Sequence, residues 1–260
     1  MNRRLTTTSD PARSLALLWG AQGKTGRSGL SVRSIVAAAM KLADAEGFAA
    51  VSMSSIAACL KAGTMSLYTH VPSKADLTDL MIDTANGELY EDATTPFQQK
   101  GGWRGSLEFI AKRNWELYQR HPWLLQAVAA RPVLGPNTTL KYEAELRPLD
   151  NLGLTDAEMD LVLSLVLTHV EATARLQASL RQSQADSGMS DMEWWVSNEP
   201  ALHRMMDAKR FPTASRVGES VGQEYQSAAN PAQTLAFGLS RILDGVEMFI
   251  AKRKRPAKRK

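Results

Sequence analysis

The sequence predicts an all-α protein built from two unequal parts. Beyond position 30, apolar residues recur at steps of three and four along most of the chain, which is the spacing of one helix face. Polar capping residues and Gly or Pro breaks separate these segments, and no alternating run would make a convincing strand. The clearest boundary is TTPFQQKGG at 94–102, which divides a smaller N-terminal part from a larger C-terminal part.

In the smaller part, the apolar pattern predicts a helix over 31–46 that Gly47 ends. Ser52 is a typical N-cap, so a second short helix is expected to begin near Met53. After a break at 62–63, TMSLYTH at 64–70 predicts a third helix of about two turns. Pro72 ends it, because the residue before a proline avoids the helical conformation. A linking helix is then expected at about 74–90.

The larger part predicts six further helices, of which the long one opens with a capping box formed by Thr155 and Glu158. The stretch FPTASRVGES at 211–220 is expected to be a loop. The predicted helices are about 103–120, 122–131, 137–149, 156–182, a weaker one at 190–210, and 231–251.

Composition describes a globular chain of 260 residues, 44% of them hydrophobic. The single cysteine, Cys59, cannot form an internal disulfide, and no signal-like segment opens the chain. The longest apolar run, LVLSLVLTHV, is about half of what spans a bilayer. We therefore expect a soluble, cytoplasmic protein without a membrane partner.

The net charge of +4 is unevenly distributed. Residues 1–30 carry +4 and residues 251–260 carry +7, so the body between them is acidic at −7. Basic ends can serve solubility alone, or they can bind a polyanion such as nucleic acid. We divide the chain into a flexible basic arm (1–29), a three-helix domain (30–75) with its linking helix (about 74–90), a larger domain (103–250) and a basic tail (251–260).

Three short helices with a tight turn between the second and third are typical of a helix-turn-helix, whose third helix enters the DNA major groove. In TMSLYTH, Leu67 is the one aliphatic residue that matches the inward positions Ile56 and Leu60. The outward side chains can then contact bases or phosphates, with Lys74 placed for a phosphate. The alternative is a small polar surface helix. The outward residues are Thr64, Met65, Ser66, Tyr68, Thr69 and His70.

The segment LSVRSIVAAAMKLADAEGFAAVSMSSIAACLKAGTMSLYTHVPSKADLTDLMID resembles the DNA-binding domain of TetR-family transcriptional regulators, including a Leu-Tyr-x-His-x-x-x-Lys signature that ends at Lys74. The resemblance implies that Ser52 and Ser54 contact the DNA backbone. It also implies base contacts from Thr64, Met65 and Ser66, and phosphate contacts from Tyr68, His70 and Lys74. One departure is Lys61, where the family usually has glycine; a left-handed lysine costs on the order of 1 kcal/mol.

Residues 31–80 contain four basic and four acidic groups, so this domain is neutral. A neutral reading domain gains little sequence-independent affinity for DNA. We therefore predict that the basic arm, through Lys24 and Arg27, lies along or in the adjacent minor groove.

Residues 103–250 resemble, more weakly, the C-terminal domain of the tetracycline repressor branch, which implies a homodimer that holds a small molecule among its helices. Two apolar stripes, 159–170 and 235–249, are consistent with a dimer bundle, or each can pack within its own subunit. Ala127 and Gln177 replace the histidine and glutamate that serve magnesium–tetracycline, so no metal or cofactor is expected. The candidate pocket residues are Trp115, Trp123, Ala127, Met159 and Gln177, and Trp194 and Trp195 are further aromatic candidates.

No other motif indicates catalysis. GKT at 23–25 lacks the strand and the first glycine of a phosphate-binding loop, and the four histidines have no metal-ligand spacing. The sequence thus predicts a dimeric regulator, most simply a repressor that a small apolar effector releases from a palindromic operator. The alternative is an all-α enzyme or small-molecule-binding module with no role on DNA.

Overall fold

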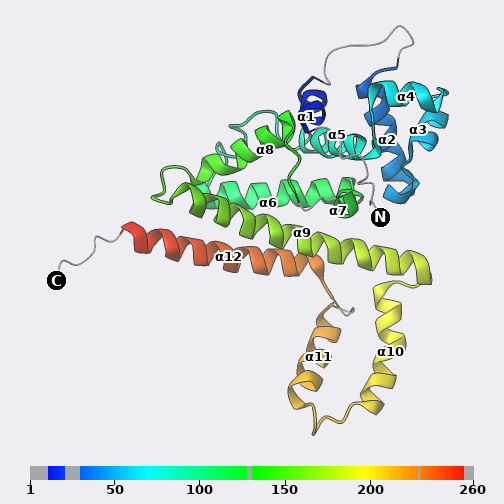
Figure 1. The fold of residues 1–260 in the computed structure, drawn as a ribbon. Coiled ribbons are helices and arrows are strands. Elements are labelled where there is room, and N and C mark those ends of the chain that lie inside the picture. Colours follow the sequence, from blue (N-terminus) through cyan, green and yellow to red (C-terminus); the bar gives the residue numbers. More distant parts are fainter. Residues whose placement is uncertain (1–10, 21–29, 128–130, 226, 228, 255–260) are drawn as a thin grey trace, which may run out of the picture.

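The computed structural model describes residues 11–20, 30–127, 131–225, 227 and 229–254, and it is all-helical over them (Figure 1). The fold class predicted from the sequence is confirmed. In chain order the elements are α1 (Pro11–Gly20), α2 (Val32–Glu46), the 3₁₀ turn η1 (Phe48–Ala50), α3 (Met53–Cys59), α4 (Thr64–His70), α5 (Lys74–Asn86), α6 (Gly102–Arg120), α7 (Leu124–Ala127), α8 (Pro136–Leu146), η2 (Arg147–Leu149), α9 (Asp156–Ser187), α10 (Asp191–Met205), α11 (Pro212–Tyr225) and α12 (Pro231–Lys254).

Serine and threonine caps set the helix starts that the sequence predicted. Ser52 Oγ accepts a hydrogen bond from the Ser55 backbone N–H at 3.1 Å, and the Ser55 hydroxyl in turn receives the Ser52 N–H at 2.9 Å. Thr155 and Glu158 make the equivalent exchange at the start of α9. These reciprocal bonds satisfy donors of the first turn that would otherwise lack partners.

The turn between α3 and α4 contains Lys61 with φ at +52°, which is the left-handed conformation considered for this position. The Ala62 N–H donates to the Ala57 carbonyl at 2.9 Å and the Lys61 N–H to the Ala58 carbonyl at 3.1 Å. This is the Schellman pattern that usually has glycine at its left-handed residue. The turn therefore has the left-handed geometry expected at this position, with lysine in place of the usual glycine.

Replacing Lys61 by glycine is expected to stabilise the protein. Relief of the left-handed strain contributes about 1–2 kcal/mol, and the greater freedom of glycine in the unfolded chain offsets about 0.5–1 kcal/mol of that. Urea unfolding should therefore give an increase of up to about 1 kcal/mol. The control Lys61→Ala keeps the strain, so an equal gain in that variant would contradict the explanation.

Part of the predicted basic arm is ordered, which corrects the expectation of a flexible segment for residues 11–20. These residues form α1, which packs against α5 through the buried Leu18. Ser14 Oγ donates to Asp76 Oδ1 at 2.7 Å, and Trp19 Nε1 donates to the Leu134 carbonyl at 3.0 Å. The sequence of this short helix has too little apolar periodicity to predict it. The contacts that stabilise it are made with residues far along the chain, which local patterns do not show.

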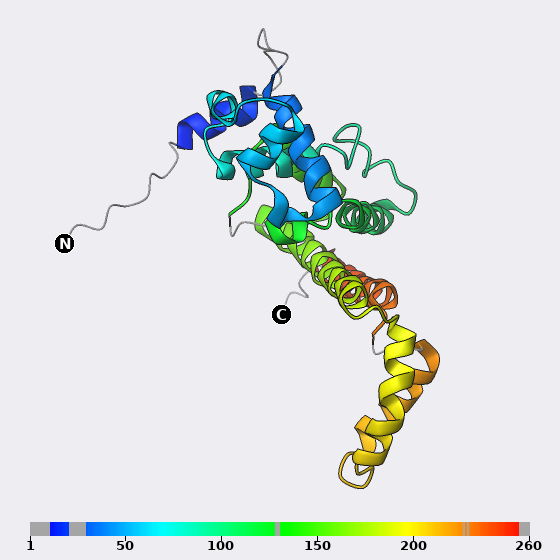
Figure 2. The ribbon, with the colours of Figure 1, turned by 90° about the vertical axis from the view of Figure 1, so that its right-hand side faces the viewer.

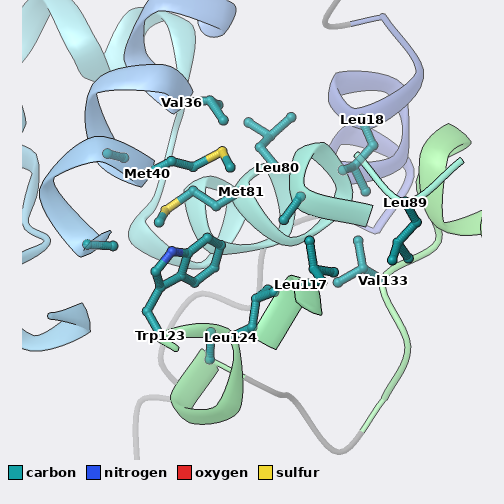
Figure 3. Packing of buried hydrophobic residues seen from close by; sticks show 14 of the residues in the cluster. Leu18, Val36, Met40, Leu80, Met81, Leu89, Leu117, Trp123, Leu124 and Val133 are labelled. Carbon is teal, nitrogen blue, oxygen red and sulfur yellow. The ribbon is translucent and has the colours of Figure 1, made fainter. Parts of the chain in front are cut away.

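The two parts of the chain share one hydrophobic core. Figure 3 shows Met40 of α2, Met81 of α5 and Trp123, just before α7, meeting in its centre. In the larger part, α9 lies between α6 and α12, and it packs along both of them (Figure 1). The helix predicted at 122–131 is shorter, because only Leu124–Ala127 is helical among its described residues.

Residues 211–220 were predicted as a loop, and this expectation is wrong, because α11 begins at Pro212 and includes the rest of them. Pro212 stands at the helix start, where its missing N–H has no cost. The helix pairs with α10, and a Cβ at Gly222 would lie 2.3 Å from the Trp195 ring, so glycine allows this approach. The α10–α11 hairpin projects away from the body in both views (Figures 1 and 2).

Candidate DNA-reading surface and effector cavity

Helix α4 has one buried side chain, Leu67, as the sequence predicted. Met65 is 77% exposed and Tyr68 is 40% exposed, and Ser66 and Thr69 are exposed beside them. The other two predicted residues, Thr64 and His70, are half-buried. The helix therefore presents hydroxyl, thioether and phenol groups to solvent with a single aliphatic anchor beneath them.

The two serines predicted at the DNA backbone differ in their surroundings. Ser52 is half-buried, and its hydroxyl is already engaged as the N-cap of α3. Ser54 is exposed, with its hydroxyl 3.0 Å from that of Ser52. Lys24 and Arg27, the predicted arm contacts, lie outside the described residues.

Lys74 stands at the start of α5, where sequence analysis placed it, but it has an aromatic neighbour that the sequence did not indicate. Its Nζ lies 5.4 Å from the centre of the Phe48 ring, within the range of a cation–π interaction. Phe48 in turn stacks on Trp123, with ring centres 6.4 Å apart and planes at 15°. The predicted phosphate ligand is thereby connected through two rings to the larger part of the chain.

A buried histidine joins the two parts. His121 Nδ1 lies 2.7 Å from Asp44 Oδ1 on α2, and its Nε2 lies 3.1 Å from Glu88 Oε2 just after α5. Trp123 Nε1 donates to the same Asp44 oxygen at 2.8 Å, and Arg120 lies 3.4 Å from Glu88. No sequence spacing indicated this cluster, because its members come from segments of the chain that lie far apart in sequence.

A cavity of about 220 Å³ lies between α5, α6, α8, α9 and the segment from α7 to α8. Its lining combines apolar side chains with amide, hydroxyl and charged groups. The apolar residues are Ile82, Leu117, Leu124, Pro132 and Val133. The polar groups are Asn86, Asn114, Tyr118, Arg131, Thr138, Lys141 and Glu171.

Behind the cavity, Glu145 is 1% exposed and accepts three hydrogen bonds. Its donors are the Tyr90 hydroxyl at 2.8 Å, Asn114 Nδ2 at 2.7 Å and Lys141 Nζ at 2.6 Å. Burial, and next the Glu145 charge, raise the pKa of Tyr90 well above its usual range, so the phenol remains a donor. Glu145 thus holds two of the cavity-lining side chains, Asn114 and Lys141, in place.

Asp83 connects the linking helix α5 to the first turn of α8. Its Oδ1 accepts from the Thr138 N–H at 2.8 Å and from the Thr138 hydroxyl at 3.0 Å. Asn86 Nδ2 donates to the same hydroxyl at 2.9 Å. Residue 135 is a glycine, which leaves space for the Asp83 carboxylate, since a Cβ there would lie 2.1 Å from Asp83 Oδ1. A ligand that displaced Thr138 would therefore act directly on α5, which carries Lys74 at its other end.

The five pocket residues proposed from the sequence lie elsewhere, and none of them lines this cavity. Trp123 is buried at the joint between the two parts, and Ala127 is buried nearby. Trp115 and Met159 pack on the core, and Gln177 is half-buried on α9. The further candidates Trp194 and Trp195 belong to α10 in the projecting hairpin.

Among the described residues, no cluster of histidine, cysteine or carboxylate side chains could hold a metal ion. None of the helices traced in the structure has the length and apolar content needed to cross a bilayer.

A small helix-turn-helix domain joined to a larger helical domain that has a pocket between its helices is typical of DNA-binding regulators of the two-part helical class. The model for bacterial regulatory proteins of the tetR family matches residues 35–81, and the model for the tetracyclin repressor-like C-terminal domain matches residues 95–250. The chain belongs to the TetR family and is a ligand-responsive, DNA-binding transcriptional repressor.

Two relatives support this assignment. The transcriptional repressor DrrR1 of Streptomyces coeruleorubidus is 36% identical over 251 residues, which cover 95% of this chain and 89% of DrrR1. The crystal structure of apo ActR from Streptomyces coelicolor is 26% identical, with a TM-score of 0.69 over 86% of this chain and 97% of ActR. ActR structures in complex with actinorhodin and with (S)-DNPA each have a TM-score of 0.67.

Proposed function

We propose that two copies of this chain bind a near-palindromic operator, with α4 of each copy in a major groove. Thr64, Met65 and Ser66 face the bases in this proposal. The side chains that hold phosphates or the sugar–phosphate backbone are Tyr68, Thr69, His70, Lys74, Ser52 and Ser54. The observation that carries it is the single buried anchor, Leu67, beneath an otherwise outward-facing helix.

Apolar side chains on the outer faces of α9 and α12 support the homodimer. The stripes predicted from the sequence mostly face the subunit's own core: Val166 and Val170 are fully buried, and Leu239 packs against the core. A second set is exposed on the same two helices, and a partner's matching helices would cover it. This set comprises Leu161, Leu165, Leu176, Phe237, Met248 and Phe249.

The effector of this proposal is a small, mainly apolar ring compound in the cavity beside Thr138. The apolar residues of the lining favour such a compound, and the amide, hydroxyl and charged groups beside them would orient it. The ActR complexes with actinorhodin and (S)-DNPA support a ring compound as the effector. Binding would shift α8 relative to Asp83, move α5 and change the separation of the two α4 helices.

A shift of the chain's own promoter fragment in a gel, followed by selection of bound DNA sites, tests the DNA part of this proposal. Binding to a near-palindrome with half-sites about one DNA turn apart is the expected result. Absence of any selected site, together with conversion of a ring compound by the purified protein, would favour the rival all-α enzyme. We place the protein in the cytoplasm, where its operator would be.

Replacing Lys24 and Arg27 together by glutamine tests the basic arm while leaving α1 intact. Operator affinity is expected to fall, and the slope of log K against log salt to flatten by about 2 per copy, because each lost phosphate contact contributes about 0.9. The matched control changes Lys209 and Arg216, two exposed cations of the hairpin. Equal slopes in the wild-type protein and the arm variant would refute the arm's role.

A further inference from the structure

A second pocket lies beside the effector cavity. It has a volume of about 210 Å³ and lies between the C-terminal end of α6 and the C-terminal half of α9. Tyr118 lines both spaces, so its side chain is the shared wall between them. Ala174 and Ala178 of α9, one turn apart on one helix face, leave this space open because their side chains are single methyl groups.

The lining of this side pocket includes a polar atom that lacks a partner. Gln119 Oε1 is buried and receives no hydrogen bond, and it is the one such side-chain atom among the described residues. A buried acceptor without a donor destabilises the folded protein, so native chains rarely keep one without a reason. A ligand that brings an O–H or N–H group to this oxygen would supply the missing donor.

The same pocket has an unpaired cation. Arg181 is exposed on α9 and has no ion pair within the described part of the chain. Arg175, about two turns earlier, is occupied by Glu171 at 2.7 Å and by the Leu125 carbonyl. Gln182 donates to Asp186 at 2.7 Å. The pocket therefore offers one free guanidinium, which suits a carboxylate, and one free acceptor, which suits a neighbouring O–H or N–H group of the same ligand.

We propose that the side pocket extends the effector site and takes an anionic, carboxylate-class group attached to a ring system in the main cavity. Arg181 pairs with the anion and Gln119 Oε1 accepts a hydrogen bond from a neighbouring ligand hydroxyl or N–H. When the ligand binds, the Tyr118 side chain rotates away, and the main cavity and the side pocket become continuous. This inference rests on the proposed function, which places the effector in the main cavity.

A pair of fluorescent probes with the same rings tests the proposal on the full-length protein. One is N-phenyl-1-naphthylamine, which is uncharged, and the other is 8-anilinonaphthalene-1-sulfonate, which adds an anion. The wild-type protein is expected to bind the sulfonate about tenfold more tightly, as one charge-assisted contact would give. Arg181→Gln should remove this preference without changing the affinity for the neutral probe.

Two variants separate this site from its alternatives. Arg131→Gln neutralises the cation of the main cavity that is not paired with Glu145, and it should leave the preference intact. Gln119→Leu removes the unpaired acceptor, so it should raise the Tm of the free protein while weakening both probes, which share the aniline N–H. A purely structural Gln119 would change the Tm alone.

Filling the main cavity with Val133→Trp distinguishes failure of this inference from failure of the proposed function. Loss of both probes in this variant places them in the effector cavity, as expected. Neutral-probe binding that survives Val133→Trp would contradict the effector site itself and the extension with it. If Val133→Trp removes neutral-probe binding, the effector site stands. In that case, equal affinities of the wild-type protein for the two probes would overturn the side pocket alone. An unchanged preference in Arg181→Gln would do the same.

Discussion

Leu67→Ala is expected to abolish operator binding and to lower the free energy of unfolding by about 3–5 kcal/mol, the usual cost of a cavity left by a buried leucine. Leu67 is fully buried and is the sole buried residue of α4. Without it, the seven-residue helix has no other core contact of its own to fix its orientation, and a helix of this length is not stable alone. Urea unfolding and operator gel shifts measure the two effects.

The matched control is Met65→Ala, two residues earlier on the same helix. Met65 is exposed, so its loss should change stability by less than about 0.5 kcal/mol. Its operator affinity should nevertheless fall, because the thioether faces the bases in the proposed complex. Comparable destabilisation by both variants would show that the inward and outward faces of α4 had been assigned wrongly.

Glu145→Ala is expected to destabilise the protein by about 3–5 kcal/mol, since removing this buried carboxylate leaves the partly buried ammonium group of Lys141 without its partner. Tyr90 and Asn114 lose their shared acceptor at the same time. Because Asn114 and Lys141 line the cavity, effector binding should weaken as well. Thermal unfolding and probe titration of the same preparation measure both effects.

Glu143→Ala is the control for this change. Glu143 lies on the same helix and pairs with Arg147 at 3.0 Å, but both side chains are exposed to solvent. An exposed pair contributes about 0.2–1 kcal/mol, so the effect should be small. If Glu145→Ala were no more damaging than Glu143→Ala, the buried cluster would not be a structural requirement of the cavity.

Several helix boundaries were predictable because a local signal marks them, although α9 continues to Ser187, five residues beyond its predicted end. Ser52 and Thr155 cap their helices through bonds to residues three positions away, and Pro72 ends α4 through its own ring. The helices that were not predicted, α1 and α11, have no such local signal and depend on contacts with distant residues. Leu18 and Trp19 are held by residues far along the chain, and α11 depends on its approach to Trp195.

The two functional regions differ in the same way. The reading surface is one short segment, so a single buried position, Leu67, decides which neighbours face outward. The cavity proposed for the effector draws its lining from five helices and a loop, and the aromatic residues selected from the sequence belong to the core, the interdomain joint or the hairpin. Aromatic content alone does not distinguish a pocket wall from a packed interior.

By itself, the sequence determined the helical class, the family and the outward face of α4, because caps, periodicity and turn residues act over a few positions. Tertiary structure alone decided where the cavity lies, how Asp83 connects it to α5, and how His121 joins the two parts. Those contacts join residues more than 30 positions apart, and their geometry follows from how whole helices pack rather than from any local pattern.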